Sequence, residues 1–486
     1  MISLLLLAVH LLAILHILWT KHRDSSSAAM WLLAVTLLPG IGLLFYLFFG
    51  ITSIDRVHSR RQALQSELSQ PDNGILGGGL RRQRDAWGQF VPPLEVLRNP
   101  RTKLLDRLFP QRLALDGNSL EILCDGTMVY PRMLADIEAA KICIRLESFI
   151  LMDDQIGRQL LDTLERKAAE GVDVKVLFDS FGSAKAILSH YLRHYFRKSP
   201  NFKIQAFSPL NLLTPWKFQL RNHRKLLIID GIIAYSGGLN ISQDNGRLAK
   251  VPPNRYIHDL HCRITGPAVS QFIQVFLQDW AYTTRRHLEE FALPADFPEL
   301  KRTGDAVVRV IESGPGENRN GSQNLFFAAA AIAQRSLYIM TPYLVPGNDY
   351  INALCMAASR GVDVRIIVPA HNNHWFVDWA ARSNYQQLLE YGIRIFEKQG
   401  IFSHAKALLV DSAWGFMGSS NCDSRSFRLN YELDFCFSED RSVDELHRQF
   451  NDELADSAEL SLHEVERRSP FMQILENCCS LLTPIL

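Results

Sequence analysis

The sequence predicts an α/β fold of two similar halves, related by a pseudo-two-fold axis and preceded by an N-terminal hairpin of two helices. Three observations predict it. A helix–strand pattern occurs twice, a short His/Lys segment recurs 181 positions further on, and two long uncharged runs open the chain. Each repeated α/β unit is expected to form a mixed sheet flanked by helices. A chain of 486 residues has room for two such units and a smaller N-terminal segment.

The two apolar runs cover residues 1–20 and 28–50, and neither contains Asp, Glu, Lys or Arg. Each has about the 20 residues that a helix needs to span a bilayer. The first run lacks the basic start and the small-residue exit of a cleaved signal peptide. A buried hairpin of a soluble core is the alternative interpretation. We expect a membrane hairpin with transmembrane helices at about 1–20 and 28–50.

Basic residues are more frequent after this hairpin than between its two runs. The intervening loop offers Lys21 and Arg23, whereas arginines at 56, 60, 61, 81, 82 and 84 follow the second run. The positive-inside rule therefore favours the cytoplasmic side for the rest of the chain.

Composition excludes some classes of protein. The net charge of +1 gives no electrostatic case for a nucleic-acid partner. The eight cysteines form no C-x-x-C pair, so neither a zinc site nor a disulfide framework is expected. Single cysteines in apolar segments are most often small buried residues, as suits a reducing compartment.

The remaining organisation follows from turn signals and from the repeat. Glycines and prolines in residues 51–105 predict a linker. Residues 106–300 and 301–470 are expected to form the two halves, because residues 168–176 match residues 358–366 as a helix end, a glycine cap and an apolar strand. The apolar tail, residues 471–486, is either a helix packed on the core or a segment at the membrane interface.

The repeated segment carries the chemistry. Each copy has a His, a Lys two residues later, four apolar residues and an Asp. Six residues further, a turn of small residues ends in an Asn. The members are His223, Lys225, Asp230 and Asn240 in the first copy, and His404, Lys406, Asp411 and Asn421 in the second.

Strand geometry predicts how these side chains point. Residues i and i+2 share a face of a strand, so each His projects with its Lys. Asp230 and Asp411 have the opposite parity and precede a turn, which indicates structural work at a strand end. The return strand is expected to bring Asn240 or Asn421 back to its own His/Lys pair.

Such a set is suited to phosphoryl chemistry. Two lysines and two amides can bind one phosphate and stabilise charge on its oxygens. One imidazole can attack phosphorus while the other protonates the leaving alkoxide. No carboxylate cluster is arranged for Mg²⁺, so the lysines are expected to replace a metal, and no cofactor is expected. Asp259 and Glu432, in apolar surroundings, are candidates to orient the two histidines.

The segment H-x-K-x4-D-x6-G-[GS]-x-N, present twice, resembles the phospholipase D superfamily. Together with the N-terminal hairpin it is similar to bacterial cardiolipin synthases over nearly the whole chain. The resemblance implies catalytic roles for His223, Lys225, Asp230, His404, Lys406 and Asp411. Ser419 is expected to add a hydroxyl to the phosphate site of the second half, where the first half has Gly238. This difference suggests that the halves are functionally unequal.

The resemblance also implies a reaction and a location. Two phosphatidylglycerol molecules would give cardiolipin and glycerol through a phosphatidyl-histidine, with His223 as nucleophile and His404 as acid by analogy with other two-motif members. The alternatives are a phospholipase D or transphosphatidylase that uses water or another alcohol, a phosphodiesterase or nuclease, and a non-catalytic scaffold. The expected partners are phosphatidylglycerol and other lipids of a bacterial inner membrane, in which the protein would be multi-pass, with no nucleic acid and no metal; the oligomeric state stays open.

Overall fold

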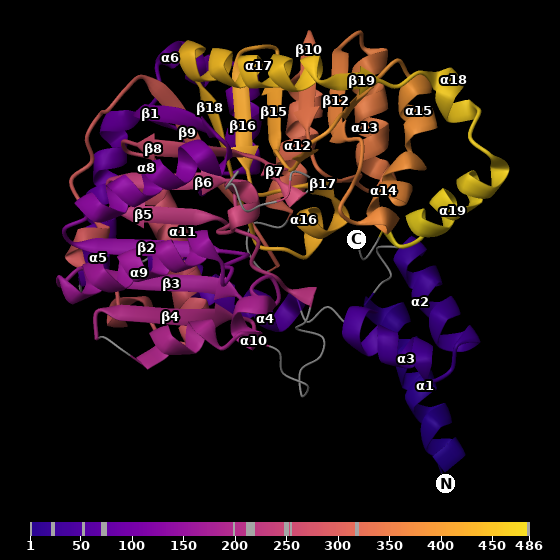
Figure 1. Ribbon diagram of the computed structural model, residues 1–486, viewed down its shortest axis with the longest axis horizontal. Coiled ribbons are helices and arrows are strands. Elements are labelled where there is room, and N and C mark those ends of the chain that lie inside the picture. The colour runs from indigo at the N-terminus through magenta and orange to yellow at the C-terminus, as the bar shows by residue number, and fades with distance from the viewer. Residues whose placement is uncertain are drawn as a thin grey trace.

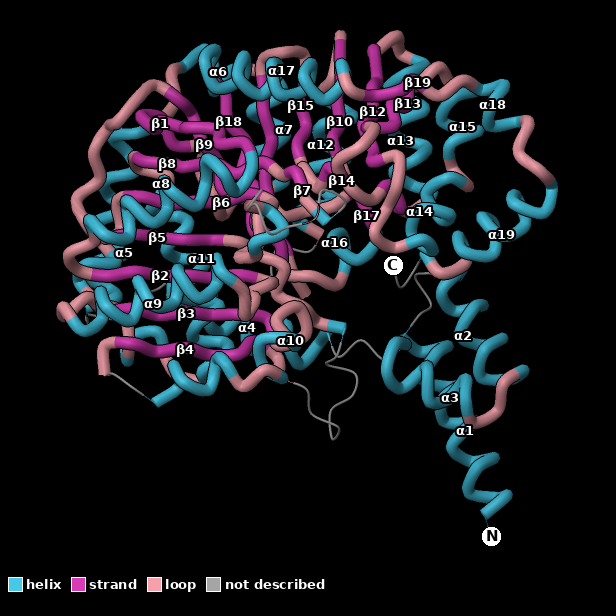
Figure 2. The backbone as a smooth tube through the Cα atoms, viewed as in Figure 1, coloured by secondary structure: helices cyan, strands magenta, loops and turns pink. Residues whose placement is uncertain are grey.

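A computed structural model describes residues 2–20, 25–50, 54–69, 75–197, 200–209, 219–246, 252, 255–315 and 320–483. Its body is built on one mixed sheet of 15 strands with helices on both faces (Figures 1 and 2). The α/β class is confirmed. The two sheets expected from the repeat are joined into one, because β1 and β9 pair antiparallel at Leu115–Val308 and Asn118–Ala306.

The strands of the first half are β1 (Leu115–Cys124), β2 (Cys143–Ser148), β3 (Asp173–Asp179), β4 (Phe202–Phe207), β5 (Leu226–Ile229), β6 (Ile233–Gly237), β7 (Ile257–His258) and β8 (Leu260–Thr265). Those of the second half are β9 (Ala306–Ser313), β10 (Ser336–Met340), β11 (Leu344–Val345), β12 (Asp363–Pro369), β13 (Arg394–Lys398), β14 (Phe402–Ser403), β15 (Ala407–Val410), β16 (Trp414–Gly418), β17 (Cys422–Asp423), β18 (Glu432–Ser438) and β19 (Ser457–Glu459).

The strand order reads the same outward from the β1–β9 junction in both halves. It is β1-β8-β6-β5-β2-β3-β4 on one side and β9-β18-β16-β15-β10-β12-β13 on the other, where β19 adds an edge strand. In each half an antiparallel hairpin, β5–β6 or β15–β16, lies beside three parallel strands. The repeat found in the sequence is thus a repeat of topology.

The helices of the body are α8 (Asp125–Ala139), α9 (Gln155–Ala169), α10 (Ala184–Leu188), α11 (Val269–Thr284), α12 (Gly321–Ile332), α13 (Asn348–Ser359), α14 (Trp375–Arg382), α15 (Tyr385–Glu390), α16 (Ser424–Arg428), α17 (Asp440–Ala455), α18 (Leu462–Glu466) and α19 (Pro470–Ser480). The predicted helix ends are confirmed, since Gly171 and Gly361 follow α9 and α13 with φ of 100° and 87°. Such left-handed positions favour glycine.

Helix α11 joins the two halves. Every residue from Val269 to Ala281 is buried. Phe272 and Phe276 belong to one apolar cluster that also contains Leu226 of the first half and Met417 and Phe435 of the second. Because this core is shared, neither half can move far relative to the other without exposing it to water.

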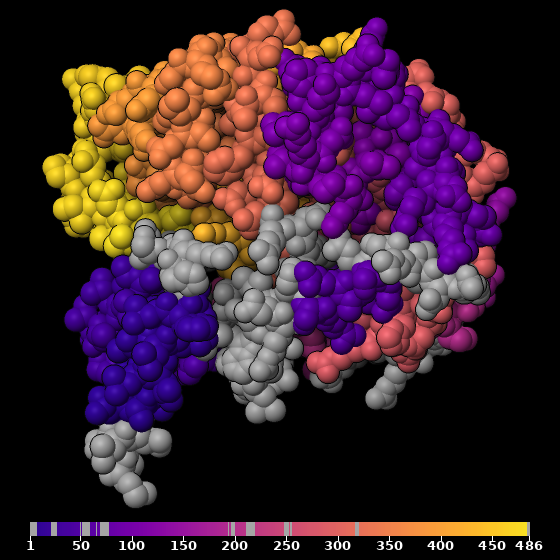
Figure 3. Space-filling model, turned by 180° about the vertical axis from the view of Figure 1, so that it is seen from behind, coloured from indigo at the N-terminus to yellow at the C-terminus, as the bar shows by residue number. Residues whose placement is uncertain are grey.

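The N-terminal helices project from the body below its C-terminal part (Figures 1 and 3). Helix α1 (Ile2–Thr20) has the predicted bounds. A single helix over 28–50 was expected, and that prediction is wrong: α2 (Ser25–Leu37) is followed by α3 (Ile41–Phe45) and a π-helix, Tyr46–Gly50. Pro39 cannot continue a helix, and Gly40 has φ of 87°. Within the described parts of the chain, none of the helices is both long enough and apolar enough to cross a bilayer.

Residues 51–105, expected as a linker, contain α4 (Ile54–Ser69), α5 (Ile75–Trp87), α6 (Leu94–Arg98) and α7 (Pro100–Leu108). Helix α4 is fastened to α11 by Arg61, whose Nη1 lies 2.6 Å from Asp279 Oδ1, with both side chains buried. The same guanidinium lies over the rings of Tyr282 and Tyr431, at 4.2 and 4.5 Å from their centroids. This segment therefore contributes to the core of the body.

The tail forms α19, which packs on α14 and is fixed by the ion pair of Arg468 with Glu476, 2.6 Å. Its other face exposes Phe471 and Ile474, at 68% and 60% of their surface. The helix thus packs on the body along one face and presents apolar side chains along the other.

We predict that removal of residues 1–53 leaves a folded body. In that shortened protein, Arg61→Gln should lower the free energy of unfolding by about 3 kcal/mol, because it breaks a buried ion pair. Denaturant midpoints measure the change. The matched control is Arg60→Gln, one residue away and less buried, with an expected change within about 0.5 kcal/mol. Equal effects of the two substitutions would contradict the role of Arg61.

Candidate active site

Each motif histidine is placed by a short parallel contact with the other half. Asn222 bridges to Tyr431, and the backbone N–H of His223 donates to the carbonyl of Tyr431 at 2.9 Å. In the second half, β14 pairs with β7, and the N–H of His404 donates to the carbonyl of His258 at 2.7 Å. Both histidines therefore lie at the junction of the halves.

The carboxylates that contact the two imidazoles are exchanged between the halves. His223 Nδ1 lies 2.9 Å from Glu432 Oε2, and His404 Nδ1 lies 2.8 Å from Asp259 Oδ2. Both carboxylates are completely buried. Sequence analysis selected these two acidic residues, and the structure adds that each serves the histidine of the other half. With Nδ1 facing a carboxylate, Nε2 is the nitrogen that each ring can use for chemistry, and Nε2 of His404 lies 3.2 Å from Lys406 Nζ.

The two lysines lie beside the histidines. Lys225 Nζ donates to the carbonyl of His223 at 2.6 Å, and Lys406 Nζ donates to that of His404 at 2.5 Å. Lys406 Nζ is also 3.9 Å from Asp259 Oδ2. Both side chains are buried, and both lysines lie directly before the strands β5 and β15 in which they were expected.

Burial lowers the pKa of all four bases, and like charge adds to it at His223, Lys225 and His404. Burial lowers the pKa of Lys225 to about 7 and that of Lys406 to about 8. Burial, with Lys406 beside it, lowers the pKa of His404 to about 3. Burial and the two lysines hold the pKa of His223 well below its ordinary value. The site accumulates cationic groups, so a bound phosphodiester anion would raise all four pKa values.

The small-residue turns do different work in the two halves. Ser419 Oγ donates to Glu432 Oε2 at 2.5 Å and accepts from the N–H of Leu433. The hydroxyl expected on the phosphate is thus used to hold the carboxylate. At Gly238, an added Cβ would lie 2.0 Å from Asp259 Oδ1, so the first half has no room for a serine.

The two motif asparagines follow the return strands β6 and β16. Asn240 and Asn421 are buried, and Asn240 Oδ1 accepts from the N–H of Ile150 at 3.2 Å. Phosphate binding by their amides remains a prediction.

The motif aspartates lie at the other ends of their strands. Asp230 accepts from the N–H groups of Lys141, Ile142 and Cys143 at 2.8–2.9 Å. Asp411 accepts in the same way from residues 334–336 and pairs with Arg101 at 2.5 Å. Their oxygens hold the starts of β2 and β10, the structural work at a strand end that parity indicates, and the catalytic role implied by the resemblance stays a prediction.

Sequence analysis missed the aromatic rings that flank the histidines. Phe149 packs edge-on against His223 with centroids 4.9 Å apart, and Tyr343 and Phe402 lie beside His404 at 6.0 and 5.9 Å. Phe149 directly follows β2, whereas Tyr343 lies three residues beyond the end of β10.

Comparison with known proteins agrees with this site. A family model described as "Cardiolipin synthase, PLD-like domain" matches residues 133–280 and 328–454, and one described as "Phospholipase_D-nuclease N-terminal" matches residues 8–50. Cardiolipin synthase 1 of Staphylococcus epidermidis is 30% identical over 96% of this chain and 93% of its own. Cardiolipin synthase of Halalkalibacterium halodurans is 30% identical over 97% and 91%.

Among solved structures, a phosphatidylserine synthase of Haemophilus influenzae covers 80% of this chain and all of its own, with a TM-score of 0.62 and 16% identity. That likeness concerns the fold alone. Fold and paired motifs together define a protein of the phospholipase D superfamily, with two phospholipase D-like domains. Within that superfamily the chain belongs to the cardiolipin synthase family.

We predict that the site binds a phosphonate monoester less tightly as pH rises from 6.5 to 9. This ligand carries one negative charge over the whole range, so the change comes from the protein. Both lysines are charged below pH 7, and each loses its charge above its own pKa. The Kd should rise by up to about tenfold per pH unit for each lysine that has lost its proton.

Titration calorimetry over this range measures the Kd. In Lys225→Gln the transition near pH 7 should disappear and the one near pH 8 should remain. A Kd independent of pH would contradict the depressed lysine pKa values.

Proposed function

We propose that this chain is a cardiolipin synthase that transfers a phosphatidyl group from one phosphatidylglycerol to another, releasing glycerol. The observation that carries the proposal is the pair of His–carboxylate contacts exchanged between the halves, in a chain whose full-length relatives are cardiolipin synthases. Two oriented imidazoles with two adjacent lysines supply a nucleophile, an acid and two countercharges around one point.

In the first step Nε2 of neutral His223 attacks phosphorus, and the bond from phosphorus to the glycerol oxygen breaks. His404, protonated once the anion is bound, donates its Nε2 proton to the leaving glycerol. Lys225, Lys406 and the amides of Asn240 and Asn421 hold the phosphoryl oxygens. A phosphatidyl-histidine and free glycerol result.

In the second step neutral His404 takes the proton from a headgroup hydroxyl of a second phosphatidylglycerol. That oxygen attacks phosphorus, and the bond to His223 breaks, which gives cardiolipin and neutral His223. Asp259 and Glu432 keep the two rings in position through both steps, and Ser419 holds Glu432. The acceptor decides between transfer and hydrolysis, since water would give phosphatidic acid instead.

The proposal includes the organisation of the chain and its place in the cell. Halves of residues 106–300 and 301–470 would be related by a pseudo-two-fold axis, which the common strand order supports. The apolar N-terminal helices, the matched N-terminal family segment and the lipid substrate support attachment to the inner membrane of a bacterium. The arginines after residue 50 favour a catalytic body on the cytoplasmic side.

Product analysis tests the reaction. Purified protein given labelled phosphatidylglycerol is expected to form cardiolipin and glycerol in equal amounts. Phosphatidic acid as the main product would identify a phospholipase D, and a mixed product with added ethanolamine would identify a less selective transferase.

The roles of the histidines separate with an activated substrate. We predict that either alanine variant lowers transfer between natural lipids at least about 1,000-fold, because the two residues act as one unit. With a p-nitrophenyl phosphodiester, which barely needs an acid, His404→Ala should still release a burst of nitrophenol and trap an adduct on His223. His223→Ala should give neither, and the reverse pattern would assign the nucleophile to His404.

Lysines and amides neutralise the phosphate in this proposal, so activity is expected to survive EDTA. Turnover after prolonged chelation and gel filtration should stay within about twofold of the untreated enzyme. Loss of turnover that Mg²⁺ or Zn²⁺ restores would overturn the proposed mechanism.

A further inference from the structure

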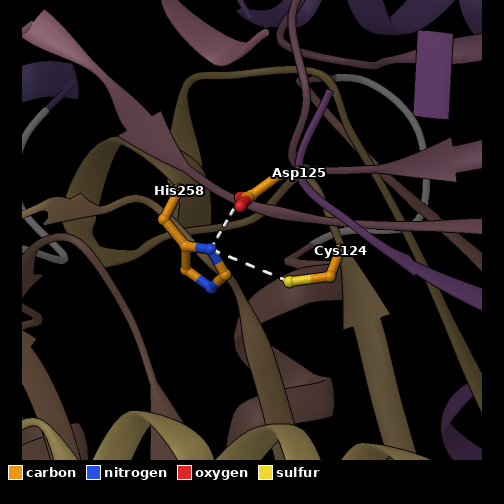
Figure 4. A group of neighbouring side chains, drawn as sticks. All are labelled: Cys124, Asp125 and His258. Carbon is orange, nitrogen blue, oxygen red and sulfur yellow. Dashed lines mark hydrogen bonds and ion pairs between the residues drawn. The ribbon is translucent and has the colours of Figure 1, made fainter. Parts of the chain in front are cut away.

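Directly behind the His404 site lies a second histidine that the proposed reaction does not use. His258 belongs to β7 and immediately precedes Asp259. Its Nδ1 is 2.6 Å from Asp125 Oδ1, and its Nε2 is 2.9 Å from Glu453 Oε1. Figure 4 shows the ring directed at Asp125, with Cys124 on the same side. The side chain is 11% exposed.

Each carboxylate ties His258 to a different part of the molecule. Asp125 begins α8 in the first half, and its backbone N–H donates to the carbonyl of Asp259 at 2.9 Å. In return, Asp125 Oδ1 accepts from the N–H of Asp259 at 3.1 Å. Glu453 lies on α17 of the second half, with Lys398 Nζ 3.7 Å away. The imidazole therefore links the two halves beside the residue that orients His404.

The charges in this cluster favour an imidazolium. Burial opposes it, but the hydrogen bonds to Asp125, Cys124 and Glu453 raise the pKa of His258 well above its ordinary value. Burial is likewise outweighed at both carboxyls, where His258 lowers the pKa of Asp125 and of Glu453. A cation between two buried anions is a strong and directional contact.

The cluster also has the composition of a metal site, because Cys124, Asp125 and His258 could converge on one ion. Both ring nitrogens of His258 already face carboxylate oxygens at hydrogen-bond distance, however. A protonated imidazole has no lone pair to offer a metal. The geometry thus favours an ion-paired triad.

We propose that His258 is a positioning residue, whose ring, clamped between Asp125 and Glu453, fixes Asp259 and His404 in the geometry for proton transfer. The inference rests on the proposed function in one respect, that His404 is the acid. Two contacts transmit the position: the carbonyl of His258 accepts from the N–H of His404, and Asp125 holds both backbone groups of Asp259.

At the equivalent place in the other half, a tyrosine stands where this half has His258. There Tyr431 precedes Glu432 and accepts from the N–H of His223 through its carbonyl. Its ring is flanked by the guanidinium groups of Arg61 and Arg224, at 4.5 and 5.6 Å. The residue whose carbonyl accepts from each motif histidine thus has its own charged neighbours. Tyr431 lies between two guanidinium groups, and His258 lies between two carboxylates.

The test uses the full-length enzyme and two substrates that differ in their need for an acid. His258→Gln is expected to lower turnover of phosphatidylglycerol about tenfold or more. A general acid contributes roughly 100-fold or more to the rate, and a misplaced His404 should lose part of that contribution. The rate of the nitrophenol burst from a p-nitrophenyl phosphodiester should change less than about threefold, because that first step barely needs an acid. His258→Lys, which keeps a positive charge between the carboxylates, should recover part of the loss. The matched control is His463→Gln on the exposed face of α18, with both activities unchanged.

Glu453→Gln removes one carboxylate and leaves the pair with Asp125, so it should shift the ratio of the two activities in the same direction but less. This milder variant keeps the test decisive if His258→Gln does not fold. Equal losses with both substrates, or an unchanged ratio, would overturn the positioning role. A stoichiometric metal ion that disappears in Cys124→Ser would also overturn it. Absence of cardiolipin from the wild-type enzyme would instead overturn the proposed function.

Discussion

The exchange of carboxylates between the halves is the contact on which the site depends. His223 is oriented by Glu432 and His404 by Asp259, so neither half contains a complete acid, base or nucleophile of its own. The shared sheet and the buried helix α11 make this exchange rigid, since opening the junction would expose the core that both halves share. A single half of this chain would present a histidine with no carboxylate to orient it. It would also contain a buried carboxylate with no histidine partner, which is costly. The two motifs are therefore parts of one site.

Burial gives this site its chemistry as well as its shape. Burial conflicts with charge on the two lysines and the two histidines, and it lowers the pKa of Lys225 to about 7 and that of Lys406 to about 8. A phosphodiester resolves it by bringing the missing negative charge. Substrate binding and protonation of His404 are then linked, because the anion that needs an acid also raises the pKa of the acid. The free enzyme, with His404 near pKa 3, keeps that proton off until a substrate is present.

Much of this could be read from the sequence, for local reasons. The repeat predicted two α/β halves, strand alternation predicted that His and Lys share a face, and the cost of a buried carboxylate singled out Asp259 and Glu432. Parity likewise indicated that Asp230 and Asp411 work at strand ends. The exchange of partners was not predictable, because local patterns do not encode which half packs against which loop. The same limit hid Arg61, whose partner Asp279 lies 218 positions away, and Ser419, whose hydroxyl is taken by Glu432. The break at Pro39 and Gly40 was a local signal that the uncharged run masked.

The unequal chemistry of the two carboxylates offers a physical reason for unequal histidines. Burial raises the pKa of Glu432, even with Lys225 nearby, whereas burial of Asp259 is outweighed by Lys406 and His404, which lower its pKa. An ionised Asp259 stabilises an imidazolium on His404, the form that an acid requires. A less readily ionised Glu432 favours a neutral His223, the form that the proposed nucleophile needs. The residues that differ between the copies act in the same sense. Asp259 packs so closely against Gly238 that a side chain there would clash with it, whereas Ser419 donates a hydrogen bond to Glu432. With His258 clamped behind Asp259, His404 is the histidine whose carboxylate partner favours a proton once a substrate anion is bound.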